Sequence, residues 1–243
     1  MTTSKIKRQN NIFVLKQKIK EAEGVLTLKF SPVKSATLSF EPGQFALVSF
    51  LDNRAAGKIR AYSISSVPQD KFLALTIKKL GAFSSALHNL KIGERMNISF
   101  PAGNFYPQES MKNIVFLAGG IGITPFYSII KDWANRGLLS RNKITLFYSS
   151  KTKKEIIFFK ELNKIADPSP NFKVIYLLTR EKTKDKRIKK FSRLNVKTIK
   201  KQLKILKGKY FFICGPIEFV NDLWKELKKN GVKENFIKTE AFY

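Results

Sequence analysis

The chain is poor in the residues that build metal sites and cross-links, since it has one cysteine, Cys214, and one histidine, His88. A disulfide, a zinc site or a protein-held iron–sulfur cluster needs more such ligands than these. We therefore predict no metal site and no structural disulfide. No neighbour of His88 in the sequence suggests a proton relay, so we interpret it as a surface residue at the end of a helix.

Long apolar runs are also absent. No segment approaches the roughly 20 apolar residues of a membrane-spanning helix. Residues 1–8 lack the apolar core of a secretion signal. We expect a cytoplasmic protein without a transmembrane segment, and peripheral contact with a membrane stays open.

Acidic residues are scarce beside basic ones: 18 Asp and Glu stand against 46 Lys and Arg, a net charge of +28. Between Arg180 and Lys209 the counts are 2 and 14. Such a charge attracts nucleic acid, anionic lipid, acidic proteins or phosphorylated ligands, and a lysine-rich solvated face gives the same pattern. A nucleic-acid-binding stretch would interleave aromatic residues with the basic ones, and this stretch has only Phe191. The composition therefore does not favour nucleic acid as a partner.

Residues 1–107 are predicted to form a β domain. Short apolar runs recur between turn signals such as Pro42-Gly43 and Pro101-Ala-Gly103. Six short strands with regular turns indicate a closed antiparallel barrel. The predicted strands span 12–15, 25–30, 45–50, 61–65, 72–77 and 96–100, with one helix at 84–90.

The pattern of apolar residues changes after residue 107, and residues 108–243 are predicted to form a second, α/β domain. Apolar strands alternate with amphipathic helices, which indicates a doubly wound parallel sheet covered on both faces. The predicted strands span 114–118, 144–148, 174–178, 210–214 and 236–241. The predicted helices span 125–135, 154–166, 196–206 and 217–230.

A glycine turn follows the first strand of the second domain. Gly119, Gly120 and Gly122 lie just before Thr124 and Pro125, where a helix begins. Such a turn presents free backbone N–H groups and the positive end of the helix to an anion, usually a nucleotide pyrophosphate. Pro125 stands where a full dinucleotide fingerprint has its third glycine, so a glycine-rich turn without a ligand stays an alternative.

The β domain has signals of its own. Arg60 and Tyr62 alternate along a strand and so project to one face. A guanidinium binds a diphosphate with two prongs, and a tyrosine ring can lie flat on another ring. Gly81 and Ser84 precede a short helix, an arrangement suited to a further phosphate contact. Taken singly, Arg60 and Tyr62 are better explained as an exposed salt-bridge residue and a half-buried strand aromatic.

Together these stretches resemble the ferredoxin–NADP reductase superfamily, in which a flavin-binding barrel precedes a pyridine-nucleotide domain. The resemblance extends from about Phe13 to Tyr243. It rests on the following stretches, in family order: Pro42-Gly43-Gln44-Phe45, Arg60-Ala61-Tyr62-Ser63, Ile77-Lys78 with Gly81, Phe83 and Ser84, Gly119-Gly120-Ile121-Gly122-Ile123-Thr124-Pro125, Cys214-Gly215-Pro216 and Glu240-Ala241-Phe242-Tyr243.

The resemblance implies roles for these residues around FAD and a nicotinamide nucleotide. Arg60 would hold the flavin phosphate, while Tyr62 and Ser63 face the isoalloxazine. Thr124 would hold the nicotinamide end, and Cys214 would pack against the reacting carbon. The second flavin segment would comprise Ile77, Lys78, Gly81, Phe83 and Ser84, and the nucleotide segments Gly119, Gly120, Gly122, Pro125, Gly215 and Pro216.

The C-terminal stretch would bring Glu240 to the site and cover the second flavin face with an aromatic ring. The chain ends one residue later than the family pattern, so Phe242 and Tyr243 both qualify. Family members often have a methionine after the Cys-Gly-Pro stretch, where Phe219 stands nearby here. The covering ring would have to move before the nicotinamide could stack on the flavin.

The choice between NADPH and NADH depends on the 2′-phosphate. Thr179-Arg180-Glu181 resembles the stretch that holds this phosphate in NADP-binding members, and Lys189 matches their next contact. Ser150 and Lys151, after the second strand, are further candidates. We predict NADP as the nucleotide and leave NAD open.

The resemblance implies a flavoprotein reductase that passes a hydride between NAD(P)H and FAD. Electrons would then pass between FAD and an acidic soluble carrier such as ferredoxin or flavodoxin. The alternatives are a reductase component of an oxygenase or other membrane-associated system, and, in a different class, a basic nucleic-acid-binding protein.

Overall fold

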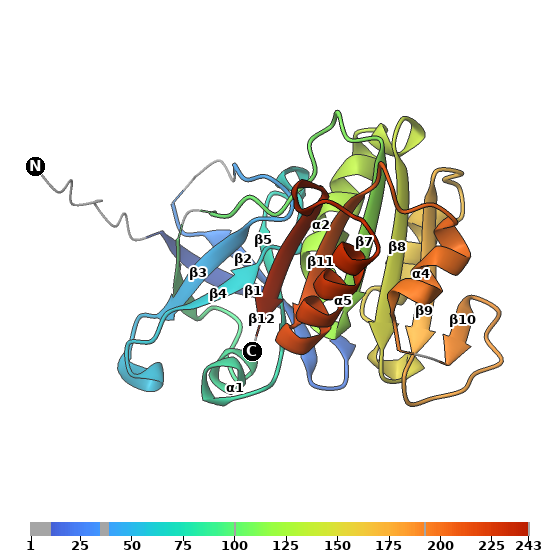
Figure 1. Cartoon of the computed structure of the whole chain (residues 1–243). Helices are drawn as coiled ribbons and strands as arrows, with labels where there is room; N and C mark the ends of the chain where they lie inside the picture. Colours follow the sequence, from blue (N-terminus) through green and yellow to red (C-terminus); the bar gives the residue numbers. More distant parts are fainter. Residues whose placement is uncertain (1–10, 35–38, 100, 192, 243) are drawn as a thin grey trace, which may run out of the picture.

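The computed structural model describes residues 11–34, 39–99, 101–191 and 193–242. Two sheets of six strands each follow one another along the chain, with the barrel strands and the larger helical half side by side (Figure 1). The boundary predicted at 107 falls between the last strand of the first sheet and the first strand of the second.

The first sheet is antiparallel, in the order β4-β3-β6-β1-β2-β5. Its strands are β1 (Ile12–Ala22), β2 (Val25–Pro32), β3 (Phe45–Phe50), β4 (Arg60–Ser63), β5 (Leu73–Lys78) and β6 (Arg95–Ile98). The sheet closes where Ile64 bridges Leu75 and the Ser65 N–H donates to the Ala74 carbonyl at 2.9 Å. The predicted closed barrel is therefore confirmed, and α1 (Ala82–His88) lies where a short helix was expected.

The first strand is longer than its apolar signal. Residues 12–15 were predicted, and β1 continues to Ala22 because it pairs with β2 along its whole length. Only Phe13 and Leu15 belong to the barrel core, so the hydrophobic pattern showed only the buried end of this strand.

The second sheet is parallel, in the order β10-β9-β8-β7-β11-β12. Its strands are β7 (Asn113–Gly119), β8 (Lys143–Ser150), β9 (Phe172–Leu178), β10 (Ile188–Phe191), β11 (Tyr210–Pro216) and β12 (Ile237–Phe242). The helices are α2 (Ile123–Asn135), α3 (Phe159–Ala166), α4 (Val196–Leu203) and α5 (Ile217–Lys229). One core cluster lies under α2 and α3 and another under α4 and α5, which confirms the doubly wound layout.

Three details differ from the sequence prediction. β10 was missed because it is a short edge strand within a lysine-rich stretch that has no apolar pattern. The helix expected at 154–166 is a 3-10 turn (Lys153–Glu155) followed by α3, separated where Phe158 takes a left-handed φ of 58°. The helix expected at 196–206 ends at Leu203, because Lys204 has a φ of 60°.

Short 3-10 turns connect several of these elements. In the described part of the chain they span Asn53–Ala55, Pro68–Asp70, Gly120–Gly122, Leu138–Ser140, Lys153–Glu155 and Glu234–Phe236. The turn at Gly120–Gly122 leads directly into α2, and so joins the end of β7 to the helix that faces the barrel.

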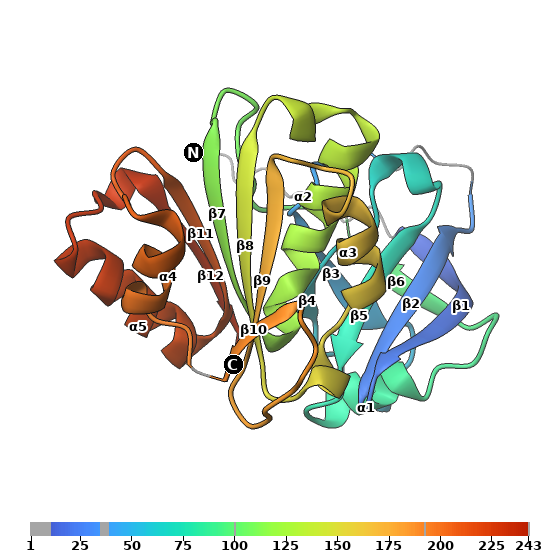
Figure 2. The same ribbon diagram turned by 90° about the vertical axis from the view of Figure 1, so that its right-hand side faces the viewer.

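The two domains share a close interface. Ala22 and Val25 of the barrel belong to the same buried cluster as α2. Polar contacts add to it: the Ser128 hydroxyl donates to the Ser66 carbonyl at 2.6 Å, and Lys131 pairs with Asp70 at 2.7 Å. Figure 2 shows α2 between the parallel sheet and the barrel. This interface fixes how the end of the parallel sheet meets the barrel wall.

Candidate active site

A cleft of about 840 Å³ lies between the barrel and the carboxyl edge of the parallel sheet. Figure 1 shows β4, α1 and the end of β12 around this region. Its wall combines the barrel motif, the glycine turn and the C-terminal strand. The sequence-predicted residues that line it are Arg60, Ala61, Tyr62, Ser63, Ile77, Lys78, Gly81, Phe83, Ser84, Thr124, Glu240 and Phe242.

An aromatic wall forms one side of the cleft. The rings of Tyr62 and Phe83 are stacked with centroids 6.3 Å apart, and Phe50 packs edge-on against Phe83 at 5.2 Å. Burial raises the pKa of Tyr62 to about 12, although the Arg60 charge opposes this. Tyr62 is therefore a neutral phenol at ordinary pH, which suits contact with a flat ring.

Arg60 lies exposed at the mouth of the cleft. Its Nη1 donates to the Ile59 carbonyl at 3.0 Å. A guanidinium has five N–H donors, so this contact leaves donors for an anion.

The turn before α1 is organised by Ser84. Its hydroxyl accepts from the Leu80 and Gly81 N–H groups at 2.9 and 3.0 Å and donates to the Gly81 carbonyl. The hydroxyl therefore shapes the turn. Lys78 lies 3.9 Å from Glu155 of the second domain and so spans the two halves of the site.

His88 lies at the C-terminal end of α1, as predicted, but it is half-buried. Its Nε2 is 2.9 Å from the Ile77 carbonyl. It is absent from the cleft lining, which leaves it a structural contact between α1 and β5.

The glycine turn owes part of its composition to packing. A Cβ at Gly122 would clash with the carbonyl oxygen of Cys214, and one at Gly215 would lie 2.8 Å from the Phe219 ring. A Cβ at Gly119 would also crowd that ring, at 3.1 Å. Gly120 alone has open space and a φ of +55°. Two glycines of the turn therefore let β7 approach β11 and Phe219, a role that the phosphate argument did not foresee.

Thr124 and Pro125 form the first turn of α2, and both are buried. The Thr124 hydroxyl donates to the Ile121 carbonyl at 3.0 Å, and the residue reaches the cleft wall. The N-terminal end of α2 thus points toward the space between the domains.

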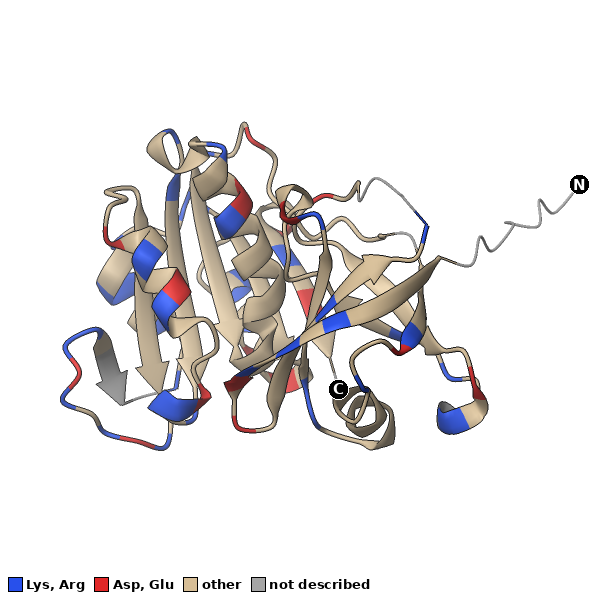
Figure 3. Cartoon of the chain, turned by 180° about the vertical axis from the view of Figure 1, so that it is seen from behind, with Lys and Arg blue, Asp and Glu red and all other residues tan. Residues whose placement is uncertain are grey.

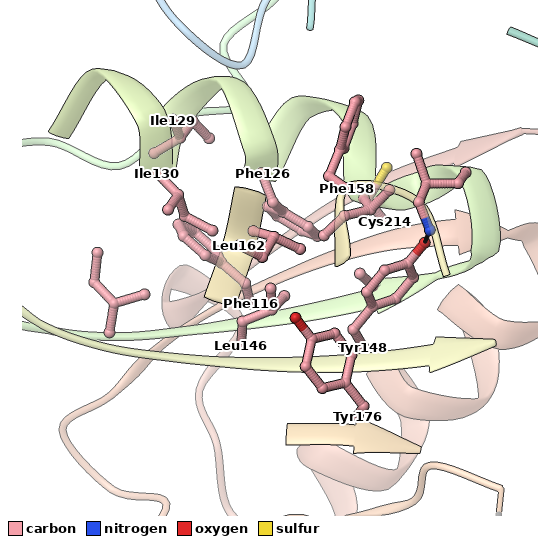
Figure 4. Close-up of a cluster of buried hydrophobic side chains, with 14 of the residues drawn as sticks. Phe116, Phe126, Ile129, Ile130, Leu146, Tyr148, Phe158, Leu162, Tyr176 and Cys214 are labelled. Carbon is pink, nitrogen blue, oxygen red and sulfur yellow. Dashed lines mark hydrogen bonds between the residues drawn. The ribbon is translucent and has the colours of Figure 1, made fainter. Parts of the chain in front are cut away.

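Cys214 and Glu240 are direct neighbours on β11 and β12. The thiol is fully buried in the core cluster with Phe126 and Phe158, as Figure 4 shows, and does not line the cleft. Burial raises the pKa of the thiol well above its usual value, and the Glu240 charge adds to this. The predicted contact between Cys214 and the nicotinamide stays a prediction.

Glu240 does line the cleft, and burial raises its pKa to about 7. Its Oε2 is buried and has no hydrogen-bond partner within the described residues. A carboxyl group in this state gains and loses a proton near neutral pH. Phe242 lies two residues later in the wall, whereas Tyr243 falls outside the described residues.

The predicted 2′-phosphate residues gather at the ends of β8 and β9. The Thr179 N–H donates to the Ser150 carbonyl at 3.0 Å, and the Arg180 N–H to the Lys151 carbonyl at 2.9 Å. Arg180 and Lys151 are both exposed there. The structure does not describe the Lys189 side chain.

Lys153 links the loop that follows β8 to the loop that follows β9. Its N–H donates to Glu181 at 2.7 Å, and its ammonium pairs with Asp185 at 2.9 Å. The Glu181 and Asp185 carboxylates are thus engaged beside Arg180.

Two family models match the chain. Residues 12–106 match the oxidoreductase FAD-binding domain, and residues 116–225 match the oxidoreductase NAD-binding domain. The chain belongs to the ferredoxin–NADP reductase superfamily. This superfamily member therefore carries an FAD-binding and an NAD-binding oxidoreductase domain in one chain, as the sequence motifs predicted.

Several named proteins resemble this reductase-superfamily chain. Flavohemoprotein A of Dictyostelium discoideum is 28% identical over 97% of the chain and 61% of its own length. The glycine betaine monooxygenase reductase subunit of Chromohalobacter salexigens is 27% identical over 92% of the chain and 62% of its own length. The chain thus spans about three-fifths of these two relatives.

Solved structures share the fold of this superfamily member. The FAD/NAD-binding domain of nitric oxide dioxygenase from Vibrio cholerae has a TM-score of 0.83 at 23% identity and covers 97% of this chain and 99% of its own. A ferredoxin NADP⁺ reductase from Neisseria gonorrhoeae, with bound FAD and NADP, has a TM-score of 0.78 at 21% identity and covers 96% and 98%.

The cleft of this superfamily member extends past Arg60 into a loop that the sequence motifs did not mark. Asn53, Arg54, Ala56 and Lys58 line this arm. Arg54 pairs with Asp52 at 2.6 Å and Glu94 at 2.8 Å, which holds the loop against the barrel. The loop has no periodic pattern, and its only sequence signal was its position just before Arg60.

Two features are absent from the described part of the chain. None of its helices is both long and apolar enough to cross a bilayer. Among the same residues, no group of His, Cys, Asp and Glu side chains is arranged to hold a metal ion.

Proposed function

We propose that the chain is an NAD(P)H-dependent flavoprotein reductase that delivers electrons to a separate acceptor. The observation that carries this proposal is the single cleft in which the barrel motif, Thr124, Glu240 and Phe242 meet. A site for hydride transfer needs both reactants in one enclosed space, and this cleft lies between the domains that match the two cofactor-binding families.

The residues of the cleft fit FAD. Its volume lies within the range of cofactor sites, and it offers an aromatic wall at Tyr62 and a guanidinium at Arg60 for the pyrophosphate. The buried Glu240 Oε2 has no hydrogen-bond partner among the residues that the structure describes, which suits a site whose ligand supplies one. FAD, when bound, would accept electrons in pairs as a hydride and release them singly.

The chain's own residues would bind the flavin, cover its ring and place polar groups and a proton-exchanging carboxyl at the reaction centre. Tyr62 would cover one ring face and Phe242 or Tyr243 the other, while Ser63 and Thr124 position polar groups at the reaction centre. Glu240 would exchange a proton at its carboxyl, since burial places its pKa at about 7. Ser84 would act by holding the turn at Gly81 in shape.

NADPH is the nucleotide that we propose. Arg180 and Lys151 lie exposed where the ends of β8 and β9 are joined, with Ser150 and Thr179 in the same pairing. Two exposed cations at the carboxyl edge of the sheet favour the binding of a 2′-phosphate. Lys189 would complete this site, as its position in the sequence predicts.

The acceptor would be an acidic electron carrier or an oxygenase component. Arg60, Lys58 and Lys78 surround the cleft, and Leu80 is 67% exposed beside them. A basic rim with an exposed apolar side chain suits an acidic protein that must approach the flavin closely. Figure 3 shows that Lys and Arg are spread over the other side of the molecule as well. A cytoplasmic location is part of this proposal.

The purified protein tests the proposal directly. We expect a yellow protein that retains one FAD per chain and whose flavin absorbance is bleached by NADPH without oxygen, at lower concentration than by NADH. Colourless protein that takes up no added FAD would refute it. A salt-sensitive shift of DNA or RNA by such colourless protein would support the nucleic-acid alternative instead.

A further inference from the structure

Behind the cleft wall, four polar side chains form a continuous row that consists of Glu21, Thr27, Thr76 and Ser65. The Thr27 hydroxyl donates to Glu21 Oε1 at 2.6 Å. The hydroxyls of Thr27 and Thr76 lie 2.7 Å apart, and those of Thr76 and Ser65 lie 2.8 Å apart. The three hydroxyl residues are buried, Glu21 is half-buried, and Thr76 lines the cleft. The row therefore connects a distant carboxyl group to the proposed flavin site by direct hydrogen bonds.

The strand register explains how the row forms. Thr27 and Thr76 lie directly opposite each other in the pairing of β2 with β5. Glu21 falls at an irregularity in the pairing of β1 with β2, between Lys20 and Ala22. A bulge of this kind re-aims a side chain, and here it brings the carboxyl group to Thr27. Figure 2 shows these neighbouring barrel strands beside the helices of the second domain.

The hydrogen bonds along the row can all run in one of two directions. Each hydroxyl has one proton to donate. When Thr27 donates to an ionised Glu21, Thr76 must donate to Thr27, and Ser65 to Thr76. When Glu21 carries a proton that it donates to Thr27, every bond reverses, and Ser65 donates to the Ala74 carbonyl, 3.2 Å away. The same atom positions serve both states, and buried hydroxyls in a row polarise one another.

The charges that face Glu21 come from both domains. Lys29 on β2 and Glu161 on α3 interact electrostatically with its carboxyl group. The Glu21 charge in turn helps to raise the pKa of Tyr127 on α2. Burial raises the pKa of Glu21 and Glu161 adds to this, while Thr27 and Lys29 oppose it. Glu21 therefore takes up a proton more readily than an exposed glutamate.

We propose that Glu21 is a positioning residue for the flavin reaction: its proton sets the direction of the hydroxyl row and so the electrostatic potential that Thr76 presents to the cleft. This inference rests on the proposed function, because it needs a flavin in the cleft. With Glu21 ionised, the oxygen ends of the row point toward the cleft and disfavour an electron-rich ligand. By linkage, reduction of the bound flavin then raises the pKa of Glu21.

The test follows the carboxyl carbon of Glu21 by NMR as the pH is changed. The full chain is measured without flavin, with oxidised FAD and with dithionite-reduced FAD. The Thr76→Val variant keeps the side-chain shape but removes the hydroxyl, and Thr76→Ser restores it. Glu23, an exposed carboxyl group two residues from Glu21, is the control in every spectrum.

We expect Thr76→Val to shift the Glu21 midpoint in the flavin-free protein, because Thr27 loses both the hydroxyl that donates to it when Glu21 is ionised and the acceptor that it needs when Glu21 is protonated. We expect reduction of FAD to raise that midpoint in the wild type and in Thr76→Ser, with most of the rise lost in Thr76→Val and none at Glu23. An unchanged Glu21 midpoint in flavin-free Thr76→Val overturns the coupled row. A shift there without any response to flavin reduction overturns the link to the cleft. Failure to bind FAD is a separate result, which removes the proposed function and this inference together.

Discussion

The Glu240 carboxyl should make the folded chain less stable as the pH rises. Its Oε2 is buried without a partner among the described residues, and burial raises its pKa from 4.5 to about 7. Between these values the folded chain holds a proton that the unfolded chain has lost, so the free energy of unfolding falls with increasing pH. At about 1.4 kcal/mol per pH unit, the shift corresponds to about 3 kcal/mol.

The assay compares urea unfolding of the wild type and Glu240→Gln, both without flavin, near pH 4 and near pH 8. Glutamine keeps the size of the side chain and removes the titration. We expect the variant to gain about 3 kcal/mol relative to the wild type between the two pH values, on the linkage argument above. Glu218→Gln, at an exposed position on α5, should show no such gain.

A constant difference between the wild type and Glu240→Gln at both pH values would refute the reasoning. It would mean that the carboxyl group is as well solvated in the folded chain as in the unfolded one. A gain of similar size in Glu218→Gln would instead show that net charge, not burial, controls the pH dependence.

Three further predictions concern the cofactors and the turn. Arg60→Ala should weaken FAD binding by about 1.5–3 kcal/mol, the usual effect of losing a charged hydrogen bond, measured by flavin fluorescence; unchanged affinity would reject the phosphate contact. Arg180→Ala should raise the KM for NADPH much more than for NADH, and equal changes would reject the 2′-phosphate site. Gly122→Ala should lower the free energy of unfolding by about 1–3 kcal/mol, because a Cβ there clashes with the Cys214 carbonyl. A smaller cost than in Gly120→Ala would argue against that contact.

The sequence predicted the barrel and the parallel sheet because their buried runs are apolar and evenly separated. It missed β10, since an edge strand that pairs with one neighbour needs no apolar pattern. It also missed most of β1, because only Phe13 and Leu15 of that strand reach the barrel core.

The candidate site was predictable where a motif concentrates chemistry in a few consecutive residues. Arg60, Tyr62 and Ser63 lie in the cleft wall as expected. Cys214 does not, because its thiol lies in the core cluster with Phe126 and Phe158, on the face of the sheet that α2 covers. Contacts between distant segments, such as Thr27 with Thr76, depend on strand register, which composition and periodicity do not reveal.

The most direct test of the central claim is the anaerobic reduction of the FAD-loaded chain by NADPH in a stopped-flow spectrometer. The flavin absorbance should fall in a single turnover, and NADPH that carries deuterium at the transferred position of C4 should reduce it more slowly. This result would show that the nicotinamide transfers its hydride directly to the flavin, which requires both rings to meet in one site. A chain that binds FAD but whose flavin neither nucleotide reduces would contradict the account.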